Sequence, residues 1–136
     1  MFRRYDREKV SDEEERIRDE VRTLSDDQRA VFYKTADKEL KDPDTYAVLN
    51  WMFLSGLHHF YLKKNFQGGL NLALSIFSLV LIFSFSKIFV IFGILLFFTL
   101  GLVELPDMFR SQVIVQDYNN QVMKGILRSG KLSRTY

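Results

Sequence analysis

The sequence contains no cysteine, which excludes disulfide bonds and metal sites built on thiolates. An apolar leader is also missing, because Arg3, Arg4 and Arg7 are followed by polar residues instead of a hydrophobic run. We therefore expect no signal peptide, and we expect membrane insertion to depend on internal segments. The spacing of a Ser/His/Asp triad, of a phosphate-binding glycine loop or of paired catalytic carboxylates is likewise missing. We accordingly expect no enzymatic activity and no cofactor.

Charge is nearly absent from the middle of the chain. Among the 58 residues from Tyr46 to Val103, the charged side chains are three lysines, Lys63, Lys64 and Lys87. A soluble domain intersperses charges along its helices, whereas an unpaired charge in hydrocarbon costs several kcal/mol. This segregation predicts an integral membrane protein, and in a bacterium it would reside in the cytoplasmic (inner) membrane.

This nearly uncharged stretch divides into three predicted membrane helices. They run over residues 46–62, 66–86 and 88–103, and the last extends through Leu105 and Pro106. The first holds 17 residues, roughly 25 Å as a helix, which is slightly short for a typical bilayer. The later segments are apolar on every side instead of alternating, which favours membrane helices over strands.

Two charged helices are predicted before the membrane segments and one amphipathic helix after them. Ser11 with Glu14, and Ser25 with Gln28, have the spacing of capping boxes. The apolar residues of the two helices that they would begin fall on one side of each helix: Ile17, Val21 and Leu24, then Val31, Phe32, Ala36 and Leu40. Residues 110–127 place Val115, Tyr118, Val122 and Ile126 on one face.

The last part of the chain is basic, and its partner is expected to be the bilayer. Residues 108–136 carry five Lys or Arg side chains against Asp117 alone. A basic tail after a membrane segment is typical of a flank that faces lipid headgroups, and no aromatic-interleaved basic stripe indicates nucleic acid. We expect Lys63, Lys64 and Arg110 to act as interfacial anchors, beside an aromatic pair formed by Phe60 and Tyr61.

Residues 56–62 read Gly-Leu-His-His-Phe-Tyr-Leu, and this motif resembles the end of the first membrane helix in the TM2 domain family. The family's last helix ends in an Asp, and an Asn follows about a dozen residues later. In this chain, Asp107 resembles that Asp and Asn119 resembles that Asn. The resemblance covers about residues 45–120 and implies a membrane module without a defined reaction. The motif residues carried over are Gly56, His58, Phe60, Tyr61, Asp107 and Asn119. The 40 residues from Gly68 to Asp107 exceed the length expected of a two-helix member, which supports a third membrane helix.

His58 and His59 invite three interpretations. Neighbouring positions on a helix diverge by about 100°, so only one of the two imidazoles should face a given partner, and no metal site is expected. An interfacial His that hydrogen-bonds backbone or headgroups is one alternative. The other is a pair between His58 and either Asp107 or Glu104, because polar groups at membrane depth tend to face partners.

Charge does not decide the orientation of a three-span chain. Lys87 would share one side with Arg29, Lys34, Lys38 and Lys41, and the other side would hold Lys63, Lys64, Arg110, Lys124 and Arg128. Five against five favours neither orientation under the positive-inside rule. A cytoplasmic N-terminus is mildly favoured by the charged N-terminal half.

These patterns predict an all-α integral membrane protein with about three transmembrane helices, two N-terminal soluble helices and a C-terminal amphipathic helix. The expected regions are 1–44, a TM2-like domain over 45–109, and 110–136. The expected function is that of a non-enzymatic scaffold, accessory subunit or regulator that acts through membrane-associated proteins or self-association. The alternative is an oligomeric transporter or channel whose polar path is lined by His58, Glu104 and Asp107.

Overall fold

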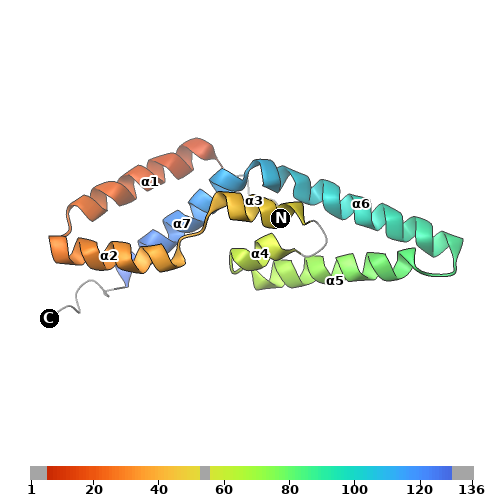
Figure 1. Ribbon diagram of the computed structural model, residues 1–136. Coiled ribbons are helices and arrows are strands. Elements are labelled where there is room, and N and C mark those ends of the chain that lie inside the picture. Colours follow the sequence, from red (N-terminus) through yellow and green to blue (C-terminus); the bar gives the residue numbers. More distant parts are fainter. Residues whose placement is uncertain (1–5, 53–55, 130–136) are drawn as a thin grey trace. The chain divides into compact units, whose positions relative to one another are not determined.

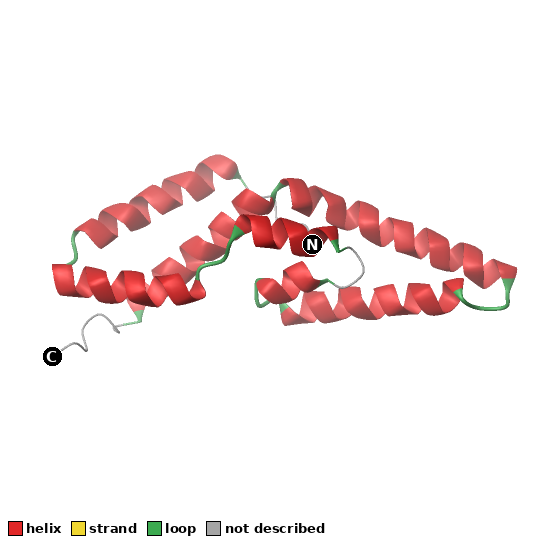
Figure 2. Ribbon diagram, in the orientation of Figure 1, coloured by secondary structure: helices red, strands yellow, loops and turns green. Residues whose placement is uncertain are grey.

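The computed structural model describes residues 6–52 and 56–129, and every regular element within these ranges is a helix (Figures 1 and 2). The all-α prediction is confirmed. The seven helices are α1 (Arg7–Arg22), α2 (Asp26–Glu39), α3 (Pro43–Trp51), α4 (Leu57–Tyr61), α5 (Asn65–Ile82), α6 (Lys87–Phe109) and α7 (Ser111–Arg128).

The chain divides into two compact units. Residues 1–42 and 112–136 form unit 1, and residues 43–111 form unit 2. The charged N-terminal region and the amphipathic C-terminal helix therefore belong to one unit, although the whole apolar stretch separates them in the sequence.

Unit 1 is held together by the apolar faces of three helices. Ile17 and Val21 of α1, Phe32 and Ala36 of α2, and Ile126 of α7 form one buried cluster. Each of these side chains lies on the face that helical spacing predicts. Around the cluster, the Asn120 amide donates to the backbone oxygen of Val10 at 2.9 Å, and Lys124 pairs with Glu13.

The two capping-box predictions have different outcomes. The Ser25 side chain accepts from the Gln28 backbone, and the Gln28 side chain accepts from the Ser25 backbone, so this box is confirmed. The Ser11 box is wrong, because α1 already begins at Arg7 after Asp6. An earlier start places Val10 on the buried face, and the burial of this valine outweighs a local capping pattern.

Unit 2 is built on a helical hairpin. In Figure 1, α5 and α6 lie side by side and antiparallel, joined by the short turn at residues 83–86. This turn lies at the end of the second predicted membrane segment, 66–86, and α6 continues past Pro106 as expected. Within the described residues, α5 and α6 are the two helices long and apolar enough to cross a membrane.

The first predicted membrane helix is not continuous. Residues 46–62 contain the last part of α3 and all of α4, with the backbone of Gly56 left-handed at φ +56°. α3 has 9 residues and α4 has 5, or roughly 13 Å and 8 Å of helix at 1.5 Å per residue, so neither can cross a bilayer. A third membrane-spanning helix is thus not found among the described residues.

The hairpin should respond differently to methyl groups added at two glycines of α6. A Cβ on Gly93 would lie 2.8 Å from the Ile82 nitrogen and 2.8 Å from the Ser78 oxygen, whereas a Cβ on Gly101 would meet nothing within 4 Å. We expect Gly93→Ala to lower the free energy of unfolding by about 1–3 kcal/mol, because backbone atoms of α5 must move. The measurement is unfolding of the protein in mixed micelles by increasing SDS.

Gly101→Ala is the matched control in the same helix. It should leave stability unchanged or raise it by up to about 1 kcal/mol, through the better helix propensity of alanine. Equal effects of the two substitutions would contradict the packing of α5 on α6 described above.

Candidate functional site

The carboxylate of Glu104 lies where the four helices of unit 2 meet. Its Oε2 accepts from Nε2 of His58 at 2.9 Å, and its Oε1 accepts from Nε2 of His59 at 3.4 Å. The Asn71 amide donates to Oε1 at 2.8 Å. These four residues, His58, His59, Asn71 and Glu104, are called the His–Glu cluster below.

Both histidines of α4 therefore contact one carboxylate, which corrects the expectation that only one of them could face a partner. The 100° separation holds for the Cβ directions, but imidazole rings are long enough to converge again beyond Cβ. Their ring centroids lie 4.0 Å apart with planes inclined by 43°. The predicted partners of His58 were Asp107 and Glu104, and in the structure its partner is Glu104.

α3 closes the cluster from another side. Tyr46, which is buried, packs its ring edge-on against His58 with centroids 5.4 Å apart. Asn50, also buried, donates from its amide to the backbone oxygen of Glu104 at 3.2 Å. The helix that was expected to span the membrane instead contributes a wall of this polar site.

The His–Glu cluster is enclosed and rich in hydrogen-bond acceptors. The side chain of His58 is 2% exposed and that of Glu104 is 12% exposed. Asn50 Oδ1, Asn71 Oδ1 and His59 Nδ1 are buried and find no hydrogen-bond partner among the described residues. A buried polar atom without a partner costs about 1–3 kcal/mol, so three of them on residues that contact Glu104 call for an explanation.

Gly56 permits the close packing that brings α4 to α5. Its φ of +56° lies in the left-handed region, and a Cβ there would fall 3.0 Å from both Asn71 Cβ and the Gly68 oxygen. Gly68 in turn lies against the ring of Phe60, which a Cβ on Gly68 would approach to 2.8 Å. The absence of a side chain at Gly56 therefore allows α4 and α5 to approach closely.

The remaining motif residues and the predicted interfacial anchors lie outside the cluster. Tyr61 ends α4, Lys63 and Lys64 connect it to α5, and Asp107 lies in the last turn of α6, followed by Arg110 at its end. Asn119 belongs to unit 1, where its amide donates to the Lys41 oxygen at 2.9 Å and its Oδ1 accepts from the Lys41 nitrogen at 2.8 Å. Asn119 thereby holds the segment that follows α2.

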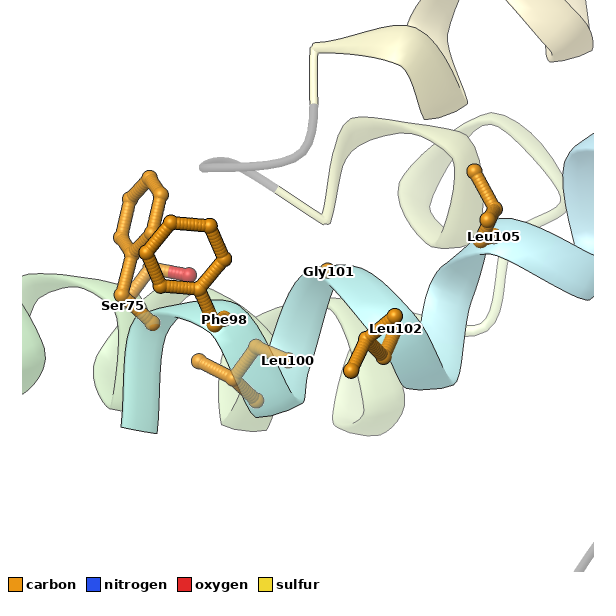
Figure 3. A pocket seen from close by; sticks show the side chains of 7 residues that line it. Ser75, Phe98, Leu100, Gly101, Leu102 and Leu105 are labelled. Atoms are coloured by element: carbon orange, nitrogen blue, oxygen red, sulfur yellow. The ribbon is translucent and has the colours of Figure 1, made fainter. Parts of the chain in front are cut away.

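An apolar pocket of about 230 Å³ opens along the hairpin (Figure 3). Ser75 of α5 contributes to it, and the other lining residues belong to α6: Phe97, Phe98, Leu100, Gly101, Leu102 and Leu105. Its lining offers hydrocarbon surface and one hydroxyl, so it provides space for apolar chains but no group for chemistry.

From the sequence, no role at this site was assigned to Asn71 or to Asn50. A usable pattern was present for Asn71. Asn71, Ser75 and Ser78 follow helical spacing among the otherwise apolar residues 68–82, and all three are buried. A polar stripe in an apolar helix indicates the face that meets other helices.

Comparison with protein-family models, with curated proteins and with solved structures found no match for this chain. The resemblance to the TM2 domain family therefore stays a prediction from the motif residues.

The hydrogen bond between Asn71 and Glu104 can be tested by a double-mutant cycle. We expect Asn71→Ala and Glu104→Ala each to destabilise the protein, and the double variant to lose less than the sum. Because the two side chains share one buried network, the interaction energy should lie between about 0.5 and 3 kcal/mol. Unfolding in micelles gives the four free energies, and strict additivity would show that the two groups do not interact.

Proposed function

We propose that this chain is an integral membrane protein in which α5 and α6 cross the bilayer as a hairpin. The observation that carries the proposal is the exposure of large apolar side chains on both helices. On α6 alone, side chains more than half exposed include Ile88, Phe89, Ile91, Phe92, Leu95, Phe98 and Leu102. An apolar surface of this extent is costly in water, whereas it costs nothing in hydrocarbon.

The interior of the hairpin supports the same proposal. The buried residues of α5 are Gly68, Asn71, Ser75 and Ser78, which are small or polar, while the exposed ones are mostly large and apolar. Soluble helices have the reverse arrangement. Small and hydroxyl-bearing residues at the contact between helices are typical of membrane proteins, because they allow close approach and hydrogen bonds.

Helix length is compatible with spanning. The 18 residues of α5 extend roughly 27 Å and the 23 residues of α6 roughly 34 Å, against a hydrocarbon core of about 30 Å. The last two turns of α6 carry Glu104 and Asp107, and Glu104 lies level with Asn71 of α5.

Two crossings place both flanking parts of the chain on one side, and this changes the charge comparison. Lys87 alone would face the far side, whereas the nine other basic residues weighed above would share the near side. Nine against one favours a cytoplasmic location for both flanking parts under the positive-inside rule. Insertion would then carry only the turn at 83–86 and Lys87 across, and unit 1 would stay in the cytoplasm.

We infer that the protein acts as a non-enzymatic scaffold, accessory subunit or regulator, with unit 1 as the part that meets partners. Unit 1 holds most of the charged surface, and its own core already buries the apolar faces of α1, α2 and α7. The transporter alternative has less support. Among the described residues, Glu104 and both histidines are engaged with each other, and the polar stripe of α5 is buried, so a path would require several copies.

Cysteine labelling tests the two-span topology, since the natural chain has no cysteine. We expect Asp12→Cys and Ser129→Cys to react with a membrane-impermeant maleimide only from the cytoplasmic side, and Ser86→Cys only from the opposite side. Labelling of intact and permeabilised cells, followed by gel-shift, provides the measurement. Asp12→Cys and Ser129→Cys reacting from opposite sides would establish an odd number of crossings and contradict the hairpin.

Purification in mild detergent tests the scaffold proposal. We expect the intact chain to co-purify with one or more proteins in a complex of defined mass, and deletion of residues 1–42 to abolish the association. The same protein in proteoliposomes should show no ion or solute flux above empty vesicles. Reproducible flux from a pure homo-oligomer would contradict the scaffold proposal and favour the transporter.

A further inference from the structure

We propose that the His–Glu cluster is a binding site for one divalent transition-metal ion, with Zn²⁺ as the best chemical match. The ligand atoms are Nε2 of His58, Nε2 of His59 and one carboxylate oxygen of Glu104, and each imidazole carries its proton on Nδ1 instead of Nε2 when the ion is bound. Each of the three offers one ligand atom, and all of these atoms lie within 4.8 Å of one another. The site goes beyond the scaffold function and does not depend on it.

The distances suit a small tetrahedral ion. Zinc bonds of about 2.0–2.1 Å place neighbouring tetrahedral donors roughly 3.3 Å apart. His58 Nε2 lies 2.9 Å from Glu104 Oε2, and His59 Nε2 lies 3.4 Å from Glu104 Oε1. The three ligand atoms lie within 4.8 Å of one another, so some of them must approach by up to about 1.5 Å before all three can bind one ion.

The donor set selects the class of metal. Two imidazoles with one carboxylate suit Zn²⁺ and other borderline divalent ions, whereas Ca²⁺ and Mg²⁺ prefer oxygen ligands alone. Three protein ligands also leave a fourth position for water or for another protein oxygen.

The unpaired buried acceptors are an independent observation in favour of a cation. Asn71 is 6% exposed, its Oδ1 has no hydrogen-bond partner among the described residues, and its amide nitrogen already contacts Glu104 at 2.8 Å. Turning this amide by 180° would present Oδ1 to the same place as a fourth ligand, and Nδ2 would then take the position that Oδ1 has now. A cation would accept the lone pair of Asn71 Oδ1. Hydrogen bonds within the cluster alone leave this oxygen without a partner.

Contacts with α3 support two of the proposed ligands, His58 and Glu104, but His59 lacks a supporting hydrogen bond. Tyr46 packs against the His58 ring, and Asn50 binds the backbone of Glu104, so the helices that carry these ligands are tied to α3. His59 Nδ1 lacks the outer hydrogen bond that metal-bound imidazoles usually make. We therefore expect an affinity below that of zinc sites with a complete outer shell.

The composition of the chain makes the test unusually clear. His58 and His59 are its two histidines and cysteine is absent, so in a tag-free protein any imidazole bound to zinc must come from this cluster. Tag-free protein in detergent, stripped with a chelator, is titrated with Zn²⁺ by calorimetry. The expected result is saturable binding of one ion per chain.

Variants assign the ligands. We expect His59→Ala and Glu104→Gln to raise the Kd for Zn²⁺ by more than the 10–100-fold that loss of an outer-shell partner causes, while Asp107→Asn removes a nearby charge and leaves the stoichiometry and Kd nearly unchanged. Circular dichroism checks that each variant keeps its helices. Absence of saturable binding to the wild type, or equal affinity in helical ligand variants, would overturn the proposal.

X-ray absorption of the zinc-loaded wild type decides the question even if the ligand variants do not fold. The proposal predicts a first shell of nitrogen and oxygen that includes two imidazoles. A first shell without imidazole would place the ion elsewhere and refute the site.

Discussion

The outward side chains of α5 and α6 are large and apolar, and unit 2 itself does not cover them. Most of the large apolar residues of α6 are exposed, and the buried faces of the hairpin carry small and polar residues instead. A helix pair that is apolar outside and polar inside is stable where hydrocarbon replaces water, because the hydrophobic penalty then disappears. The same environment penalises any unpaired polar group, so the polar groups of the hairpin must find one another.

In the proposed bilayer, Glu104 would satisfy this second requirement. Its carboxylate accepts hydrogen bonds from α4 and α5, and its backbone oxygen accepts one from α3. Three separate helices are thus tied to one turn of α6. The short helices α3 and α4, which are too short to span a bilayer, obtain their positions from this polar site and from the contact of Phe60 with Gly68.

The sequence predicted the features that depend on local pattern and failed where distant contacts decide. The capping box at Ser25, the turn after Phe83 and the buried face of Phe32 and Ala36 follow from spacing alone. The break at Gly56 did not, because apolar composition cannot distinguish one 17-residue helix from two short ones. Likewise, the convergence of His58 and His59 on Glu104 depends on ring length and on the approach of α6, which residue spacing does not contain.

The most direct measurement of the central claim is the partition of the natural chain between membrane and water. Membranes carrying the protein are washed at alkaline pH, and the released and retained fractions are compared, followed by sedimentation of any released protein in detergent-free buffer. If hydrocarbon surrounds the α5–α6 hairpin, the protein stays in the membrane pellet and enters solution only with detergent. A chain that is released by the wash and sediments as a single monodisperse species without detergent would contradict the account.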